Sequence, residues 1–332
     1  MSTYIGIDVS KAKLDVAWIR DPATNKVKTR VFGNRKKDYP ALLDWLLKQT
    51  GQPVEQLHIL MEATGIYHES LAYFLYGSGV RVSVINPARI HSYAKSLNTQ
   101  HKTDKSDSVV IARFGASHAP HTLWQPEPAE IRKLKALLNR IQALETDLQR
   151  ERNRLEKLDS SADQQDAVYQ SLRHMIQVLE KEKSQLEKDV DDHIDRHPQL
   201  KKDQALLQSI PGIGPVLSRL MLSVIKSRDF TSAPQCAAFL GLIPHLRESG
   251  TFKGQTRLSK RGNPLIKTKL YMAAVVASQH NPTIKMQRQR LLQNGKNKMQ
   301  ALGAAMRKLV HLCYGVLKTQ TPYNAEAAMP GS

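Results

Sequence analysis

Cysteine is scarce in this 332-residue chain, and long hydrophobic runs are absent. The two cysteines, Cys236 and Cys313, lie in apolar surroundings and at no metal-binding spacing, so we expect inert core thiols of a cytoplasmic protein. No stretch approaches the roughly 20 apolar residues that a membrane-spanning helix needs. The first residues also lack the apolar segment of a signal peptide. The sequence therefore predicts no membrane partner.

Acidic residues are also few, with 30 Asp and Glu against 49 Lys and Arg, which gives a formal net charge of +19. This balance favours a polyanionic partner, and nucleic acid is a better match than a membrane surface. The charge is uneven: residues 1–121 carry 16 basic and 10 acidic side chains, residues 122–200 carry 13 and 16, and residues 201–332 carry 20 and 4. These shifts predict three regions of the chain.

Residues 1–121 have the pattern of an α/β domain. Short apolar runs predict strands at residues 4–9, 14–19, 27–32, 57–62 and 80–85, and helical spacing predicts helices at residues 41–47, at 67–76 and from 104 onward. The resulting order, βββαβαβα, is that of the ribonuclease-H-like fold.

Acidic side chains stand at the ends of these predicted elements. Asp8 ends the first strand, Glu62 ends the fourth, and Asp104 and Asp107 are three apart on one face of a first helical turn. Hard divalent cations prefer carboxylate oxygens, and two such ions can clamp the attacking and leaving oxygens of a phosphodiester. The alternative is a set of surface charges and helix caps, a role that Asp104 could fill. The fold order and the four positions together favour a metal site.

Residues 122–200 carry leucine and isoleucine at intervals of seven. One line continues from Leu134 to Leu155, a second line is interrupted by Glu151, and a following segment repeats the spacing. The members are Leu134, Ile141, Leu148 and Leu155; Leu137, Leu144 and Leu158; and Leu172, Leu179 and Leu186. This pattern predicts either an antiparallel helical hairpin or an intermolecular coiled coil. A solvated arm without a partner would leave the apolar stripe uncovered, so we favour a coiled coil that helps assemble protomers.

The last region, residues 201–332, is predicted to be mostly helical and strongly basic. Its segment from Ile210 to Gly214 is similar to the turn of a helix-hairpin-helix element, in which Gly212 and Gly214 would let backbone N–H groups approach a phosphate. A plain helix–loop–helix is the alternative. Downstream, cations alternate with hydroxyl groups and glycines, as in loops that hold phosphates. The cations are Arg247, Lys253, Arg257, Lys260 and Arg261.

Six motifs, taken together and in order, resemble the DEDD transposases of bacterial insertion sequences, whose relatives include the Piv-type DNA invertases. They are Ile5-Gly6-Ile7-Asp8-Val9-Ser10-Lys11, Glu62-Ala63-Thr64-Gly65, Val84-Ile85-Asn86-Pro87, Lys102-Thr103-Asp104-Lys105-Ser106-Asp107, Ile210-Pro211-Gly212-Ile213-Gly214 and Glu248-Ser249-Gly250. The resemblance covers nearly the whole chain. It implies a RuvC-like catalytic domain at residues 1–121, a coiled-coil assembly region at 122–200 and a C-terminal transposase domain at 201–332.

The resemblance also implies the chemistry. Asp8, Glu62, Asp104 and Asp107 would bind Mg²⁺ or Mn²⁺, and Ser249 would be the nucleophile; the residues alone do not favour this serine over Ser259 or Ser106. The partners would be target and donor double-stranded DNA and a structured non-coding guide RNA. We expect a dimer or tetramer with composite active sites, associated with the bacterial nucleoid. The resemblance does not decide the family subgroup.

Three other functions compete with an RNA-guided recombinase. A junction-resolving endonuclease would use metal-activated water and need no serine. A nucleotide-dependent phosphotransferase can begin with a Gly-Ile-Asp strand, but it needs a glycine-rich turn that residues 9–13 do not supply. A non-catalytic architectural DNA binder would leave the four carboxylates unexplained.

Overall fold

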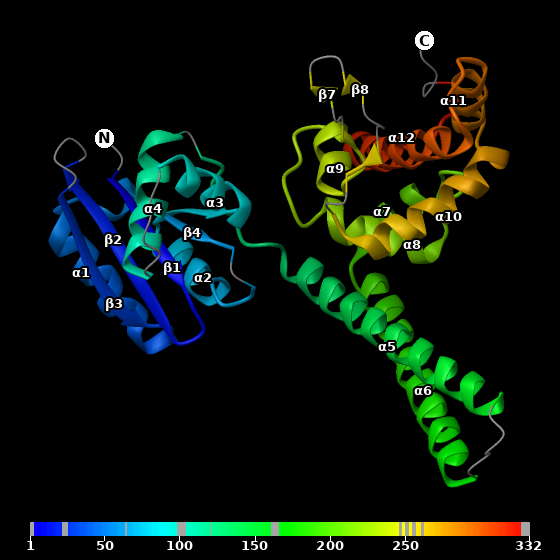
Figure 1. The fold of residues 1–332 in the computed structure, drawn as a ribbon, viewed down its shortest axis with the longest axis horizontal. Helices are drawn as coiled ribbons and strands as arrows, with labels where there is room; N and C mark the ends of the chain where they lie inside the picture. The colour runs from blue at the N-terminus through cyan, green and yellow to red at the C-terminus, as the bar shows by residue number, and fades with distance from the viewer. Residues whose placement is uncertain are drawn as a thin grey trace. The chain divides into compact units, whose positions relative to one another are not determined.

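The computed structural model describes residues 3–21, 26–63, 65–97, 104–119, 121–160, 166–245, 248–249, 252–253, 257–259 and 262–326. The chain divides into two compact units, Met1–Pro126 and Glu127–Ser332 (Figure 1). Each unit has its own hydrophobic core, so each is described by itself. The three regions that the sequence indicates remain a prediction.

A five-stranded mixed sheet forms the centre of the first unit. Its strands are β1 (Thr3–Val9), β2 (Lys13–Asp21), β3 (Lys26–Gly33), β4 (Leu57–Glu62) and β5 (Arg81–Ile85). Their order is β3-β2-β1-β4-β5, with β1, β2 and β3 antiparallel and with β4 parallel to both β1 and β5. The mixed α/β fold class and the predicted sequence of strands are confirmed.

Helices cover both faces of this sheet (Figure 1). They are α1 (Tyr39–Thr50), α2 (Glu69–Gly77), α3 (Pro87–Ser96) and α4 (Asp104–Ser117). Ile5 and Ile7 of β1 pack in one core with Leu42 of α1 and Leu71 of α2. A second core joins residues of β4, β5, α3 and α4, among them Leu60, Ile85, Ile90, Ile111 and Phe114. Alternate side chains along each strand therefore pack into two apolar layers, one on each face of the sheet.

His58 of β4 lies inside the first unit. No spacing links it to another histidine, so the sequence predicts a surface or hydrogen-bonded position, and the second is confirmed because the residue is only 1% exposed and its ring is hydrogen-bonded. Its Nε2 is 2.8 Å from the Ser83 hydroxyl, which in turn donates to the carbonyl oxygen of Thr122. Among the described residues, Nδ1 has no hydrogen-bond partner. Burial, with the nearby Arg81 and His121, lowers the pKa of His58 to about 4, so the ring is neutral at pH 7.

The second unit begins with two long helices, α5 (Ala129–Asp159) and α6 (Asp166–Asp195), which pack side by side as an antiparallel hairpin (Figure 1). Ion pairs cross between them, from Arg152 to Glu180 at 2.6 Å and from Lys183 to Glu145 at 3.5 Å. The predicted line of apolar residues on α5 is buried at Leu134, Ile141, Leu144 and Leu148. Of the two predicted arrangements, the chain forms the hairpin, and an intermolecular coiled coil remains a prediction.

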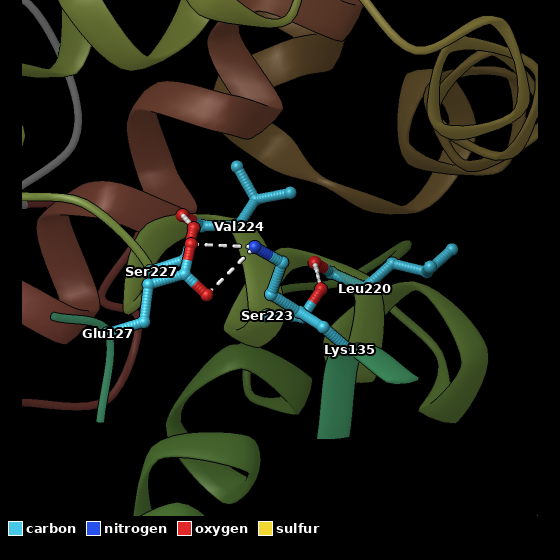
Figure 2. Close-up of polar contacts among 6 residues, drawn as sticks. All are labelled: Glu127, Lys135, Leu220, Ser223, Val224 and Ser227. Carbon is cyan, nitrogen blue, oxygen red and sulfur yellow. Dashed lines mark hydrogen bonds and ion pairs between the residues drawn. The ribbon is translucent and has the colours of Figure 1, made fainter. Parts of the chain in front are cut away.

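Short polar contacts fix the beginning of α5 and the end of its neighbour α8 (Pro215–Ile225). Lys135 donates to both carboxylate oxygens of Glu127, at 2.7 and 2.8 Å. The hydroxyls of Ser223 and Ser227 donate to the carbonyl oxygens three residues earlier, at 2.8 and 2.9 Å (Figure 2). The bond from Ser227 satisfies a carbonyl group that the end of α8 leaves without a helical partner.

The rest of the second unit is a helical body with a large apolar core. Its other helices are α7 (Pro198–Gln208), α9 (Ala233–Phe239), α10 (Pro264–His280), α11 (Pro282–Gln293) and α12 (Lys298–Thr319). Cys236 and Cys313 are free and fully buried, which confirms the predicted core thiols. No helix within the described residues is long and apolar enough to span a membrane.

Candidate active site

Asp8 and Glu62 end two neighbouring parallel strands. The register pairs Ile7 of β1 with Met61 of β4, so the residues that follow lie beside each other at the carboxyl ends of these strands. Both carboxylates are partly buried. Parallel strands place their carboxyl ends at one edge of a sheet, and the sequence therefore brings two distant acids together through pairing alone.

Helix α4 covers the face of the sheet that carries both carboxylates. A Cβ atom added to Gly6 would lie 2.2 Å from the carbonyl oxygen of Ser108 and 2.4 Å from the backbone nitrogen of Ala112. One added to Gly115 would lie 2.7 Å from Cδ1 of Leu60. Gly6 and Leu60 thus face α4, and the residues two positions later on each strand, which are the two carboxylates, share that face.

The first turn of α4 lies at the same end of the sheet. The helix passes over Gly6 at Ser108 and over Tyr4 two turns later, so it runs antiparallel to β1. Asp107 and Asp104 therefore lie beyond Gly6, towards the end of the strand. Asp107 is partly buried, whereas the side chain of Asp104 lies outside the described part of the chain. We call this set the carboxylate corner: Asp8, Glu62, Asp104 and Asp107.

The turn between β1 and β2 is held rigidly beside this corner. The Ser10 hydroxyl donates to the carbonyl oxygen of Lys13 at 2.9 Å and accepts from its N–H at 3.2 Å. The Asn34 amide donates to the carbonyl oxygens of Ser10 and Tyr67, at 2.8 and 3.1 Å. Asn34 in turn accepts a bond of 2.8 Å from the Tyr39 hydroxyl. The two loops that leave the carboxylate-bearing strands are therefore tied to each other.

Sequence reasoning missed one acid near this corner. Asp15 pairs directly with Asp8 in the β1–β2 ladder and is only 4% exposed. The ammonium group of Lys13 lies 3.1 Å from its Oδ2 atom. The apolar–polar alternation of β2 predicts an outward position for Asp15, and its burial comes from α4, which the chain adds about ninety residues later. The available signal in the sequence was the spacing Lys13-x-Asp15, because residues two apart on a strand lie on the same face and can form an ion pair.

The donor set of the carboxylate corner suits a hard divalent cation, because all four residues offer carboxylate oxygens and carry negative charge. Among the side chains that the structure describes, no group of three or more His, Cys, Asp or Glu residues is arranged to hold a metal ion. The described part of the corner brings Asp8 and Glu62 together by register and places Asp107 on the helix above them.

Ser249 lies in the second unit, in a small β structure between α9 and α10. Strands β6 (Pro244–His245) and β9 (Arg257–Leu258) pair with each other, and β7 (Glu248–Ser249) pairs with β8 (Phe252–Lys253). The pairing of Ser249 with Phe252 places the serine next to the end of this nested hairpin. Its side chain lies outside the described part of the chain. We call residues 244–261 the basic loop.

The predicted phosphate-binding cations belong to the basic loop. Lys253 is in β8 and Arg257 in β9, with side chains outside the described part, and Arg247, Lys260 and Arg261 lie wholly outside it. The base of the loop is described and is anchored. Arg307 donates to the carbonyl oxygen of Leu242 at 3.2 Å, and the Lys267 ammonium donates to that of Ser259 at 2.7 Å.

The glycine-rich turn between α7 and α8 has a packing role at Gly212. This residue has a φ of +103°, and a Cβ atom there would lie 2.7 Å from Cβ of Ala277 on α10. The Asn281 amide also donates to the carbonyl oxygen of Pro211 at 3.3 Å. Gly214 differs, because it caps the N-terminus of α8 and a Cβ atom there would meet nothing within 4 Å. Phosphate binding at Gly212 and Gly214 remains a prediction.

The five-stranded mixed sheet, with acids at the ends of two parallel strands and followed by a mostly helical, basic C-terminal part, is compatible with a ribonuclease-H-like domain joined to a helical one. Comparison with known proteins identifies the family. Residues 5–159 match the DEDD transposase model of the IS110 group, described as a transposase. Residues 204–289 match the model for the transposase IS116/IS110/IS902 family.

One relative matches nearly the whole chain, and another matches about two thirds of it. The chain is 34% identical to the pilin gene-inverting protein of Moraxella bovis over 325 residues, which are 97% of this chain and 98% of that protein. It is 26% identical to the transposase for insertion sequence element IS1111A of Coxiella burnetii over 246 residues, 67% of this chain and 66% of that protein. The chain therefore belongs to the IS116/IS110/IS902 transposase family, and it is a DNA transposase or recombinase.

Proposed function

We propose that this protein is an RNA-guided DNA recombinase of an insertion sequence, which cuts and exchanges strands through a serine-linked intermediate. The observation that carries the proposal is the pairing of β1 with β4, which sets Asp8 beside Glu62 under the helix that begins with Asp104 and Asp107. A helical unit rich in cations accompanies this corner, as expected for an enzyme that holds nucleic acid.

The carboxylate corner would hold Mg²⁺ or Mn²⁺. A bound divalent ion supplies positive charge that stabilises the attacking and leaving oxygens of a phosphodiester during in-line displacement. The residues of this chain position that charge. Asp8 and Glu62 are fixed by the sheet, and Asp107 is fixed by a helix that contacts the sheet backbone at Gly6. Such rigid placement is what electrostatic catalysis requires.

Ser249 would be the nucleophile. Its hydroxyl oxygen forms a bond to phosphorus and loses a proton, while the bond from phosphorus to one sugar oxygen breaks and that oxygen gains a proton. Attack by the hydroxyl end of another strand reverses the step and frees the serine. The number of phosphodiester-type bonds stays constant, so strand exchange needs no nucleotide cofactor. The basic loop that carries Ser249 would hold the phosphates on either side.

Contact between the unit that carries the serine and the unit that carries the carboxylates would complete the active site. The serine and the carboxylates belong to different units of the chain, so each cut would require both units to meet, within one protomer or between two. Helix α6 exposes Val168, Met175 and Val178, at 44%, 45% and 40%, along its outer side. An exposed apolar stripe of this kind favours contact between hairpins of neighbouring protomers in a dimer or tetramer.

A second outcome of the same chemistry is DNA inversion. The full-length match to pilin gene-inverting proteins favours it, because inversion and transposition differ in how the two DNA sites are arranged rather than in the bonds exchanged. A junction-resolving endonuclease remains the alternative. It would use the carboxylate corner with water as the nucleophile and would leave Ser249 without a role.

The proposal is tested by purifying the protein with its bound RNA, sequencing that RNA, and supplying DNA substrates that match it. Recombined products should form with Mg²⁺ and the RNA, and should be lost after ribonuclease treatment or chelation of the metal. Products that are unaffected by ribonuclease would refute RNA guidance. Strand cleavage without any joined product would favour the junction-resolving endonuclease.

A further inference from the structure

Asp15 adds a fifth carboxylate to the neighbourhood of the carboxylate corner. It is the direct cross-strand partner of Asp8, and it borders a cavity of about 220 Å³ together with Ser108 of α4. Its side chain therefore lies on the same face of the sheet as the corner. Cβ atoms of paired residues are about 4.5–5.5 Å apart, and like charges at this separation destabilise a sheet. A buried acid at this position requires a positive charge nearby.

Lys13 supplies such a charge. Its Nζ atom is 3.1 Å from Oδ2 of Asp15, although the carboxylate side chain is 6% exposed and the lysine side chain 43%. The backbone of Lys13 is fixed by the Ser10 side chain on both its N–H and its carbonyl group. The backbone that carries the ammonium group is therefore fixed by the turn, and the contact with Asp15 shows that this face of the sheet accepts a cation.

The cavity beside Asp15 has a volume of about 220 Å³ and is lined by residues of β2, β3 and α4, so among the described acids near the corner Asp15 is the one that borders it. Mg²⁺ in proteins usually keeps several waters and takes only one or two carboxylates directly. Residues around those waters tune how tightly the ion is held.

We propose that Asp15 is a positioning residue of the carboxylate corner, and that the opposed charges of Asp15 and Lys13 set the corner's affinity for a divalent cation. The inference rests on the proposed function, because it assumes that the corner binds metal. Asp15 attracts the ion to the corner through its negative charge. Its ion pair with Lys13 also helps to fix the turn beside the corner. Lys13 offsets that charge and competes with the ion, so the two residues act in opposite directions.

The test is the affinity of the full chain for Mn²⁺, measured from the electron paramagnetic resonance signal of free Mn²⁺. D15N keeps the size of the side chain and should weaken binding about tenfold, the lower end of the range for residues around a metal's ligands. K13Q removes the competing charge and should tighten binding, whereas K13R should bind as the wild type does. D44N, which removes an exposed acid of α1, is the control and should change nothing.

Thermal unfolding with and without Mn²⁺ separates this role from a structural one. The added stability that Mn²⁺ confers should shrink in D15N and grow in K13Q. If D15N and K13Q lower the midpoint equally with and without Mn²⁺ and leave the affinity unchanged, the inference is wrong. D8N separates the proposal that the corner binds metal from the proposal that Asp15 tunes it. If D8N weakens Mn²⁺ binding and D15N does not, only the role of Asp15 is refuted. If D8N also has no effect, the metal corner itself fails.

Discussion

In both units a glycine lets a helix pack closely against another part of the chain. The charges differ, because acids gather at one end of the sheet in the first unit and cations are spread over the second. Gly6 lets α4 contact the backbone of β1, and Gly212 lets a turn contact α10. In the first unit these contacts fix acids at the end of a sheet. In residues 201–332, 20 basic side chains stand against only 4 acidic ones, and several of the cations belong to helices α10, α11 and α12.

This difference follows from what each unit would contact. Acids repel one another, so a group of them needs a rigid frame and a cation, and the sheet with its helix provides the frame. Cations that hold a nucleic-acid backbone each contact a separate phosphate, so they can be spread over a surface. The division predicts that changes in the first unit alter the rate of strand cleavage and that changes in the second alter binding.

The largest expected effect is at the carboxylate corner. Asp107→Asn should reduce strand exchange by about a hundredfold or more, because a lost ligand charge removes stabilisation of the reacting oxygens. Binding of RNA and DNA should remain within about twofold of the wild type. The measurements are a strand-exchange assay and a binding titration, with Asp44→Asn as the matched control on an exposed surface of α1. Full activity in Asp107→Asn would contradict the division.

The next effect concerns the basic loop. Replacing Lys253, Arg257, Lys260 and Arg261 with alanine should weaken binding to any duplex sequence. The slope of log affinity against log salt should become shallower by about 0.9 for each phosphate that the loop no longer neutralises, or about 3.6 if all four cations bind phosphates. Binding is measured by fluorescence anisotropy at several salt concentrations.

The control for the basic loop is a set of lysines in the first unit. Lys36, Lys37 and Lys48 are exposed, and their replacement by alanine removes similar charge without touching the loop. An equal loss of slope for each charge removed in both sets would show that binding depends on net charge alone. The claim that the second unit governs binding would then be wrong.

A smaller effect, on the free energy of unfolding, is expected at Gly6 and Gly212, where the backbone packs closely against another element. Gly6→Ala forces α4 away from β1 and should cost about 3 kcal/mol, at the upper end for overpacking. Gly212→Ala also meets a positive φ and should cost about 2 kcal/mol. Because each unit has its own core, chemical denaturation should show one transition shifted by each change. If both variants shift a single common transition, the units unfold together.

The smallest effect at neutral pH is at His58. Its folded pKa of about 4 lies below the ordinary value of 6.5, so between these values the unfolded chain binds a proton that the folded chain does not. Stability should therefore fall as the pH drops from 6.5 towards 4, by up to about 3 kcal/mol. His58→Gln should lose less over the same range. Urea unfolding at pH 7 and pH 4.5 measures this, and equal losses would exclude His58 as the cause.

The sequence predicts those parts of the fold whose periodicity is strong. Strands β1 and β4 carry short apolar runs, and the hairpin helices repeat leucine and isoleucine at intervals of seven. Helices α3, α9 and α11 were not predicted: α9 has only seven residues, α3 buries only Ile90, and α11 buries only Thr283 and Ile284, so neither of the longer two shows an apolar stripe. Local pattern does not reveal helices that depend on their neighbours for packing.

The site was predictable to the extent that it lies at the ends of elements. Asp8 and Glu62 lie in the last residues of strands β1 and β4, so their meeting depends only on strand pairing. Asp15 was missed because its burial depends on a helix distant in sequence, and the packing role of Gly212 depends in the same way on α10. Ser249 is proposed from the resemblance alone, because the residues do not favour it over Ser259 or Ser106 and its side chain lies outside the described part of the chain.

The most direct test of the whole account is whether Ser249 becomes joined to DNA. End-labelled DNA is incubated with the protein, its RNA and Mg²⁺, quenched, and run on a denaturing gel with and without protease. The account predicts a slowly migrating, protease-sensitive species in the wild type, which is lost in Ser249→Ala although that variant still binds RNA and DNA. Ser259→Ala, on the described edge of the same loop, should retain the species. Cleaved strands from Ser249→Ala would contradict the account and favour water as the nucleophile.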